Sequence, residues 1–388
     1  MITVAQALDQ LFALARPLEA ETVPLSAAAG RVLARPVTAR RDQPPFPASA
    51  MDGYAVPQAT PGARFTVIGE SAAGSRFDGP VGPGQAVRIF TGAPVPQGAT
   101  RIVIQEDTMR EGDTITLRDT LDDNPYIRPA GTDFRIGDTV AAPRLLSSRD
   151  VALLAAMNIA EVPVTRKPRV ALISTGDELV MPGDTPGPDQ IIASNTFGLH
   201  ALLRDIGAAP RILPIARDTA ASLTHAFDLV EDADLVITIG GASVGDHDLV
   251  ARVAAELGME RAFHKVAMRP GKPLMSGRLR DAMMIGLPGN PVSAMVCGHV
   301  FVAPVIRAML GLGAAPAPRR RATLTAPLEP NGKREHYMRA QLTDDGIAAL
   351  DRQDSSLLSV LGAANALLVR PVDDPARAIG EQVDYLPL

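Results

Sequence analysis

The stretch between Pro168 and Leu310 constrains the fold most, because short apolar runs alternate there with longer segments of helical pattern. Short apolar runs bounded by turn residues are typical of buried strands, and longer amphipathic segments are typical of helices. Repeated strand–helix units predict a doubly wound parallel sheet with helices on both faces. We expect strands at 169–174, 211–216, 234–239 and 282–287, and helices at 194–206, 219–230, 249–257 and 291–310.

The segments on either side of this stretch have a different character. Thr3 opens a capping-box pattern, which predicts an amphipathic helix over 3–16. A further helix is expected from Ser148 or Asp150 to Met157. Short β-like runs separated by Gly and Pro predict two β domains, one over 20–130 and one over 319–388 after a linker at 314–318.

Composition argues against several classes of protein. The 388 residues include 38 basic and 43 acidic ones, a net charge of −5, which disfavours a surface for nucleic acid. The single cysteine, Cys297, offers neither a disulfide framework nor a multi-cysteine metal site, and we expect it to be inert core. We find neither a leader pattern nor an apolar run of membrane-spanning length, so we expect no membrane contact and a cytoplasmic location.

Unusual residues gather where the expected strands end. In an open parallel sheet, ligands bind at the carboxyl ends of the strands, near the switch in strand order. Glycines, acids and prolines follow the expected strands at 175–178, 217–218, 240–248 and 288–291, and a basic loop at 268–273 precedes the last strand. The sequence therefore predicts a binding site at this edge.

A glycine-rich loop is the clearest single feature of that edge. Gly240, Gly241 and Gly245 permit positive φ and let backbone N–H groups converge on an anion, and Ser243 adds a hydroxyl. A tight strand–helix turn that needs glycine only for packing is the alternative. The Asn290–Pro291 helix start also suits a phosphate, but taken alone it favours a purely structural cap.

Charged residues surround the same loops. Glu178, Asp218 and Asp248 suit Mg²⁺ held against a phosphate, with a helix-cap role as the alternative, above all for Asp218. Arg269 and Lys272 flank a Pro-Gly turn and suit an oxyanion, with a solvated basic turn as the alternative. The six histidines have no zinc-ligand spacing, and we regard His247 as a bystander.

Six short strings in order carry a family resemblance: SAMDGYA (49–55), TGAPVP (91–96), STGDEL (174–179), GGASVGDHD (240–248), RPGKP (269–273) and LPGNPVSA (287–294). Together they resemble the MoeA family of molybdopterin molybdenumtransferases, which is related to the gephyrin E domain. The resemblance implies a multidomain α/β plus β fold with four parts. These are an N-terminal helical and β framework (1–22, 41–48, 131–167), an inserted β domain (23–40, 49–130), a doubly wound α/β molybdopterin-binding domain (168–312) and a C-terminal β-barrel-like domain (319–388).

The resemblance also implies a set of cleft residues. Its acidic positions fall on Asp52, Asp133, Glu178, Asp218 and Asp248, and its cleft threonine on Thr91. Its basic loop corresponds to Arg269 and Lys272, its proline turn to Pro288 and Pro291, and its last domain contributes Arg339 and Ser355. The family often shows Gln-Gly-Ser where this chain has Gln353-Asp354-Ser355, which adds a charge.

The implied activity is insertion of molybdate into adenylated molybdopterin with release of AMP, in an elongated homodimer whose cleft is built from both subunits. In this interpretation the Gly240–Gly245 loop and the 290–291 helix start hold the pterin phosphate. Glu178, Asp218 and Asp248 hold Mg²⁺, while Arg269 and Lys272 hold molybdate or phosphate. Asp52 and Thr91 come from the partner subunit, and contact with a molybdopterin adenylyltransferase is a further implication. The alternatives are an adenylyltransferase-like enzyme and a gephyrin-like scaffold without catalysis.

Overall fold

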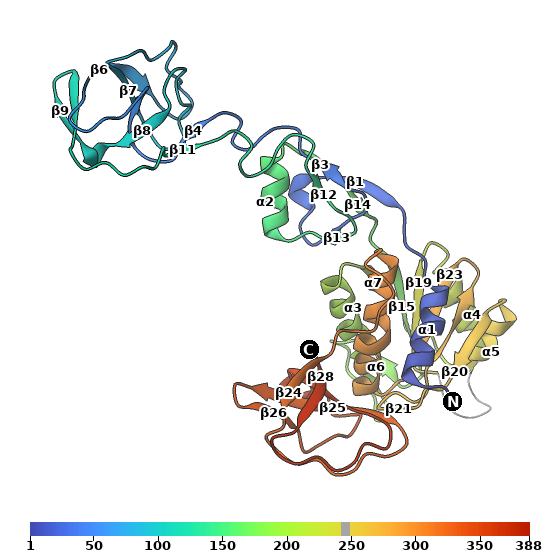
Figure 1. Cartoon of the computed structure of the whole chain (residues 1–388). Coiled ribbons are helices and arrows are strands. Elements are labelled where there is room, and N and C mark those ends of the chain that lie inside the picture. The colour runs from blue at the N-terminus through green and yellow to red at the C-terminus, as the bar shows by residue number, and fades with distance from the viewer. Residues whose placement is uncertain (242–248) are drawn as a thin grey trace. The chain divides into compact units, whose positions relative to one another are not determined.

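The computed structural model describes residues 1–241 and 249–388. The chain divides into two compact units. One comprises 1–21, 30–34 and 165–388, and the other comprises 22–29 and 35–164. Figure 1 labels many of their elements.

A six-stranded sheet forms the centre of the first unit, in the order β18-β15-β19-β23-β22-β20. Four strands are parallel, as the alternating pattern predicts. The prediction of a purely parallel sheet is wrong at one edge, where two antiparallel strands were missed. The turn between β22 and β23 consists of Arg280-Asp281. It contains no glycine, so the sequence lacks the Asn-Gly or Asp-Gly pair that usually predicts a hairpin. The bounds are β18 (Ala209–Ile212), β15 (Arg169–Ser174), β19 (Leu235–Ile239), β23 (Ala282–Leu287), β22 (Met275–Leu279) and β20 (Glu260–His264).

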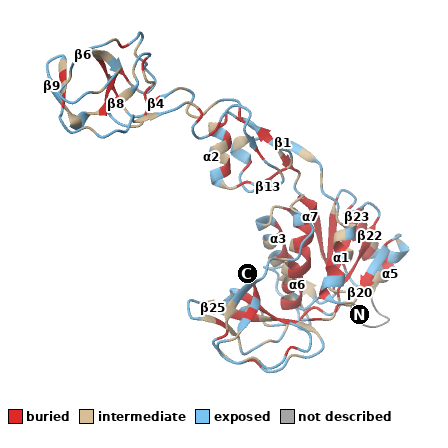
Figure 2. Ribbon diagram, viewed as in Figure 1, coloured by how far each residue is buried: buried red, intermediate tan, exposed pale blue. Residues whose placement is uncertain are grey.

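Helices cover both faces of this sheet (Figure 1). Side chains alternate along β19, so that Leu235 and Ile237 enter one core while Val236 enters the other. The first core includes residues of α1 (Val4–Leu14), α3 (Asn195–Asp205) and the helix that begins at Pro291. The second includes residues of α4 (Ala220–Asp228) and α5 (Leu249–Glu256). Figure 2 shows the buried residues concentrated on these strands and helices.

The helix after β23 is long and apolar. It runs from Pro291 to Met309 as α6 (Pro291–Cys297), a π-helical turn η3 (Gly298–Val302) and α7 (Ala303–Met309). Its composition and length would also suit a membrane span, with a mean hydropathy of 1.6. Because 78% of this window is buried, the apolar character is accounted for by the core of the domain.

Two predicted boundaries need correction. Helix α2 (Ser148–Ala156) is capped by Ser147, not by Ser148 or Asp150, because Asp150 occupies the third helical position and completes a capping box with Ser147. The strand expected at 211–216 is β18, which begins at Ala209 and ends at Ile212. Pro214 follows and cannot donate to a ladder.

A second sheet of the first unit is formed mainly by the C-terminal residues, in the order β21-β25-β27-β28-β24, with β26 beside β25. Its first strand comes from the basic loop ahead of β22, so the loop joins this sheet and not the α/β sheet. Tyr337, Leu367 and Val369 face the α/β core, and Ala340 and Leu368 face a separate core. The bounds are β21 (Met268–Arg269), β24 (Arg320–Thr323), β25 (Glu335–Thr343), β26 (Gly346–Ala349), α8 (Leu358–Ala363), β27 (Ala366–Arg370) and β28 (Gln382–Pro387).

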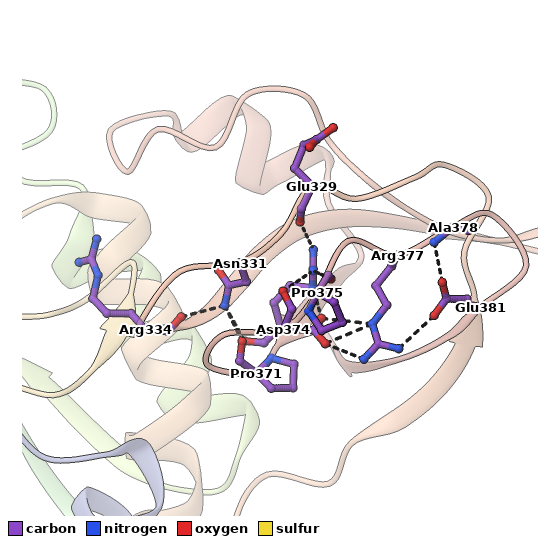
Figure 3. Close-up of polar contacts among 10 residues, drawn as sticks. Glu329, Asn331, Arg334, Pro371, Asp374, Pro375, Arg377, Ala378 and Glu381 are labelled. Carbon is purple, nitrogen blue, oxygen red and sulfur yellow. Dashed lines mark hydrogen bonds and ion pairs between the residues drawn. The ribbon is translucent and has the colours of Figure 1, made fainter.

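A charged network closes the loop between β27 and β28 (Figure 3). The Arg370 guanidinium donates through Nε to Asp374 Oδ2 at 2.5 Å, and both side chains are buried. Arg377 donates to Asp374 Oδ1 and reaches Glu381 at 3.0 Å. Burial opposes ionisation of Asp374, but the hydrogen bonds from Arg377 and Arg370 outweigh it and lower its pKa.

The second unit contains a six-stranded sheet in the order β8-β5-β7-β6-β10-β9. All its pairs are antiparallel except that of β6 with β7. The sheet strands are β5 (Gly53–Val56), β6 (Arg64–Ser71), β7 (Gln85–Ile89), β8 (Arg101–Ile104), β9 (Thr108–Glu111) and β10 (Thr114–Leu117). Shorter elements are η1 (Leu25–Ala27), β3 (Val37–Thr38), β4 (Ala48–Ser49), η2 (Gln105–Asp107), β11 (Ile127–Arg128), β12 (Thr139–Val140) and β13 (Arg144–Leu145). Strands β1 (Ala20–Pro24), β2 (Val32–Leu33) and β14 (Glu161–Thr165) lie where the chain passes between units.

Candidate functional site

The strand ends of the α/β sheet line a cavity of about 1120 Å³ in the first unit. It lies where β15, β19 and β23 end, as the fold rule for ligands in open sheets predicts. The predicted site residues in its lining are Glu178, Asp218, Gly240, Gly241, Lys272, Pro288, Asn290 and Pro291. Ser243, Gly245, Asp248 and His247 fall outside the described residues.

Two glycines at the end of β19 have the conformation that the sequence predicts. Gly240 has φ +90° and Gly241 has φ +65°, both in the left-handed region. A Cβ on Gly241 would lie 2.3 Å from Val250 Cγ2, and one on Gly240 would lie 2.8 Å from the Thr175 carbonyl oxygen. Glycine is therefore required here for close packing as well as for φ.

The Glu178 carboxylate folds back over Gly176. Gly176 has φ +149°, and a Cβ there would lie 2.3 Å from Glu178 Oε2. The absence of a side chain at 176 thus makes room for the carboxylate. Sequence reasoning did not single out Gly176 for this role.

Asp218 does not cap the helix that follows it. Thr219 does so, since its side chain accepts the Ser222 N–H of α4. The Asp218 N–H donates to Asp177 Oδ1 at 3.2 Å, and the Arg217 guanidinium donates to the Asp177 carbonyl at 3.0 Å. These contacts join the two loops that carry Glu178 and Asp218, and leave the Asp218 carboxylate at the cavity.

Asn290 connects the cavity to the C-terminal residues. Asn290 is the residue before the helix, but its side chain makes no capping hydrogen bond, so the side chain does not have the purely structural role of a cap. Pro291 does occupy the first turn, as the sequence predicts. Asn290 Nδ2 instead donates to Ser355 Oγ at 2.9 Å, and the Val292 N–H donates to the Ser355 carbonyl at 3.0 Å. Two predicted residues 65 positions apart are thereby in contact.

Arg339 is a fully buried cation beside this contact. Its Nη2 donates to the Asp354 carbonyl at 3.0 Å, whereas Nε and Nη1 have no hydrogen-bond partner among the described residues. A buried guanidinium with unused donors suits an anion. Asp354 Oδ1 accepts from the Ser356 N–H at 2.8 Å and from its hydroxyl, which lowers the Asp354 pKa and keeps a carboxylate near Arg339.

The basic loop pairs through β21 with β25, the strand that carries Arg339. Arg269 lies opposite His336 in the register with β25, and Lys272 lines the cavity, which Arg269 does not. Burial, followed by the charges of Arg269 and Arg339, lowers the pKa of His336 to about 4. The imidazole is therefore neutral at pH 7, and the positive charge around it comes from arginines, with Arg269 and Arg339 contributing most.

The remaining predicted residues lie in the second unit. Asp52 Oδ1 accepts from the Thr91 N–H and from its hydroxyl, both at 2.7 Å. The hydrogen bond from the Thr91 N–H lowers the pKa of Asp52 most, and the bond from the hydroxyl comes second. The positive charge of Arg88 lowers this pKa further. Asp133 is exposed, and its N–H donates to the Gln43 carbonyl at 2.9 Å.

Sequence reasoning missed several residues that line the cavity. Asn195, interpreted as a possible helix cap, donates through Nδ2 to the Gly289 carbonyl at 2.7 Å and so holds the Pro-Gly-Asn-Pro turn. Thr175 has a buried hydroxyl without a partner among the described residues. Nothing in the sequence marked Arg252 as a site residue, because an exposed arginine on an amphipathic helix is ordinary.

Cys297 is buried, which raises its thiol pKa and agrees with an inert core residue.

Family models match nearly the whole chain in three segments. Residues 2–158 match the MoeA N-terminal region (domain I and II), 171–308 match a probable molybdopterin binding domain, and 321–388 match the MoeA C-terminal region (domain IV).

Full-length relatives and solved structures agree with these matches. A molybdopterin molybdenumtransferase from Nostoc sp. is 36% identical, covering 95% of this chain and 89% of its own. Molybdopterin molybdenumtransferase 2 from Mycobacterium tuberculosis is 39% identical, covering 93% of each. The crystal structure of a molybdopterin biosynthesis MoeA protein from Pyrococcus horikoshii has a TM-score of 0.86 at 29% identity, covering 100% of this chain and 99% of that one. On this combination of family matches, relatives and fold, the chain belongs to the MoeA family of molybdopterin molybdenumtransferases.

Proposed function

We propose that this protein inserts molybdate into adenylated molybdopterin and releases AMP, the final step in making molybdenum cofactor. The observation that carries the proposal is the cavity at the sheet edge. Glu178 and Asp218 line it together with Lys272. Asn290, also in the lining, donates to Ser355, and the preceding residue, Asp354, accepts a hydrogen bond from the buried cation Arg339 through its carbonyl. Such a site presents charges of both signs to two anionic substrates, whose mutual repulsion would otherwise oppose their approach.

The pterin phosphate is assigned to the glycine turn and the helix start. Gly240 and Gly241 lie in the lining with Asn290 and Pro291, at the amino end of a helix that continues to Met309. Helix amino ends favour anions through their free N–H groups and dipole. Pro288 and Asn195 shape and hold this turn.

Glu178 and Asp218 would hold Mg²⁺ at the phosphoanhydride, with Asp248 as the third predicted ligand. The described residues contain no group of three His, Cys, Asp or Glu suited to a metal. Two cavity-lining carboxylates still fit Mg²⁺, which commonly takes one or two protein carboxylates and completes its shell with water and phosphate oxygens. When bound, the ion would neutralise charge on the phosphate oxygens.

Molybdate is assigned to the basic corner. Arg339 offers Nε–H and Nη1–H donors, Ser355 a hydroxyl, and Lys272 and Arg269 further positive charge. These groups would hold the dianion while the two thiols of the substrate bind molybdenum as thiolates and their two protons leave with one oxo ligand as water. A separate water molecule would hydrolyse the anhydride bond and release AMP. Sulfur is a suitable donor for this metal.

The wider setting belongs to the same proposal. We assign Asp52, Thr91 and Asp133 to the cleft of a homodimer in which each site draws residues from both subunits, and we expect contact with a molybdopterin adenylyltransferase. The Asp52–Thr91 pair supports this role, because an exposed carboxylate fixed by two hydrogen bonds is oriented without being neutralised. We place the reaction in the cytoplasm.

The test is AMP release by the purified protein supplied with adenylated molybdopterin, Mg²⁺ and molybdate. We expect Glu178→Ala to abolish AMP release and molybdenum insertion while thermal unfolding stays unchanged. Glu260→Ala is the matched control, since Glu260 is exposed on β20 and does not line the cavity. Full activity of Glu178→Ala would remove Glu178 from the site. AMP transfer from ATP to molybdopterin by the wild type would indicate an adenylyltransferase instead.

A further inference from the structure

Arg88 makes a group of contacts beside Asp52 and Thr91 that the proposed function does not use. Asp52 directly precedes β5, and Thr91 follows β7 by one intervening residue, Phe90. The two functional side chains are therefore on neighbouring chain ends of one sheet, and their contact depends on how those ends are held.

The guanidinium of Arg88 ties three chain segments together. Nη1 donates to the Gly53 carbonyl at 3.2 Å, and Nη2 donates to Gln105 Oε1 at 2.7 Å. The Gln105 N–H in turn donates to the Asp52 carbonyl at 3.1 Å. Both peptide carbonyls at the start of β5 are thus engaged, one directly by Arg88 and one through its partner Gln105.

Two aromatic rings lie close to the same guanidinium. Arg88 Cζ lies 5.1 Å from the centre of the Tyr54 ring and 4.8 Å from that of Phe90. Tyr54 is buried and pairs with Arg88 across the strands, whereas Phe90 immediately precedes Thr91. Cation–π contacts of this kind favour a planar, delocalised cation with a fixed orientation.

The backbone at this point leaves little freedom for an alternative arrangement. A Cβ on Gly53 would lie 2.0 Å from the Val103 carbonyl oxygen, so β5 and β8 approach closely where the Arg88 bond is made. Asp52 Oδ1 is occupied by Thr91, and Oδ2 has no partner among the described residues. The direction in which Oδ2 points is therefore set by the same contacts that hold the chain ends.

We propose that Arg88 is a positioning residue for the Asp52–Thr91 pair, which it holds by linking the start of β5, the end of β7 and Gln105. The inference rests on the proposed function, because it assumes that Asp52 acts on substrate. A lysine at 88 would keep the charge but could not donate in two directions from one plane while lying against two rings.

The experiment compares Arg88→Ala and Arg88→Lys with the wild type, and uses Arg64→Ala as a control on an exposed residue of the same sheet. We expect Arg88→Ala to lower kcat for AMP release by about 10- to 100-fold with little change in KM, the loss typical of a misplaced group. Millimolar guanidinium chloride, far below denaturing concentrations, should restore part of the rate by filling the vacated place near the Tyr54 and Phe90 rings, whereas equal concentrations of urea or sodium chloride should not.

Two further readouts separate positioning from a merely structural role. Amide hydrogen exchange at Thr91 should become faster in both variants, because its N–H loses a fixed acceptor. The acid limb of the kcat profile should move to higher pH in both variants, because weaker Thr91 hydrogen bonds raise the pKa of Asp52, and it should move further in Arg88→Ala, which also loses the positive charge.

The outcomes are distinct. Wild-type kcat and unchanged Thr91 exchange in Arg88→Ala would overturn the inference, as would a lost rate with unchanged Thr91 exchange and no guanidinium rescue. If Arg88→Ala does not fold, the rate and Thr91 exchange of Arg88→Lys decide. If the wild type itself releases no AMP, the proposed function fails, and Thr91 exchange in the two variants still tests whether Arg88 holds the pair.

Discussion

Single residues at the cavity act mainly by holding a neighbour in place. Gly176 gives the Glu178 carboxylate its room, Asn195 holds the proline turn, and Asp177 accepts the Asp218 N–H. None of these three residues needs to contact substrate to affect the geometry of the proposed site. A metal-binding carboxylate must be held in its productive direction, because binding in a poorly aligned geometry loses the rate advantage of preorganisation.

We predict that Gly176→Ala lowers activity by about tenfold or more, since its Cβ would displace the Glu178 carboxylate. Gly258→Ala is a matched control, because Gly258 also has positive φ (+90°) but has no atom within 4 Å of the added Cβ. Both changes strain the backbone, and only the first moves Glu178. Steady-state AMP release measures the effect, and equal losses in the two variants would attribute it to backbone strain alone.

The extra charge at Asp354 gives a second prediction at this scale. Burial lowers the pKa of Arg339, and the negative charge of the nearby Asp354 carboxylate partly offsets that effect. The carboxylate therefore competes with an incoming anion for Arg339. Asp354→Asn keeps an oxygen for the Ser356 bonds, and we expect it to tighten molybdate binding by about two- to fivefold, as removal of one like charge from a partly solvated site would.

Isothermal titration with molybdate at two salt concentrations measures this change. Asp351→Asn is the control, because Asp351 is exposed in the same loop and makes no hydrogen bond or ion pair among the described residues. Weaker binding by Asp354→Asn would show that the carboxylate supports the site through the loop conformation and does not compete with the anion.

At the scale of elements, the loop between β27 and β28 depends on the buried Arg370–Asp374 pair. Removing one partner of a buried, hydrogen-bonded ion pair leaves the other uncompensated. We predict that Asp374→Asn lowers the local free energy of unfolding by about 3 kcal/mol. Hydrogen exchange of the β27 amides measures it, and Asp384→Asn, in an exposed and longer ion pair, should change it little.

The same pair has a defined pH dependence. Because the folded-state pKa of Asp374 is lowered, its contribution is fully present above the unfolded value of about 3.9 and is lost as pH falls through the folded pKa. The difference between wild type and Asp374→Asn should therefore be constant near neutral pH and shrink below about pH 4. A difference that grows with acidification would contradict the assignment.

How far the sequence predicts these elements follows from the range of the interactions involved. The cavity could be located because strand ends of a parallel sheet share one edge, which brings Glu178, Asp218 and Gly240 together by topology alone. The path of the chain between β21 and β23 could not be predicted, because a two-residue strand such as Met268–Arg269 has no periodicity. The Asn290–Ser355 contact likewise joins distant segments and leaves no local pattern.

For the whole molecule, the four-domain division expected from the resemblance stays a prediction, and so does the composite dimer. The described cavity lies within one unit, whereas Asp52 and Thr91 lie in the other. If each cleft draws on two subunits, the two halves of the site can be disabled separately.

We therefore predict that inactive Glu178→Ala and Asp52→Asn proteins recover activity when their subunits are exchanged. A random mixture would contain one intact site in each mixed dimer, which corresponds to about one quarter of wild-type activity. AMP release after exchange, with mixed dimers verified by differently tagged subunits, is the measurement. Absence of recovery in verified mixed dimers would mean that each cleft is built by one chain.

The pairing of β21 with β25 has a consequence for any shortened form of the protein. The loop that carries Arg269 and Lys272 belongs by sequence to the α/β region, yet its strand is hydrogen-bonded to residues past 330. A chain terminated after residue 312 would keep both cations but would lose the neighbouring strand that fixes their backbone. Residues 319–388 thus support the backbone of the proposed site, and we expect the α/β region alone not to hold these two cations in place.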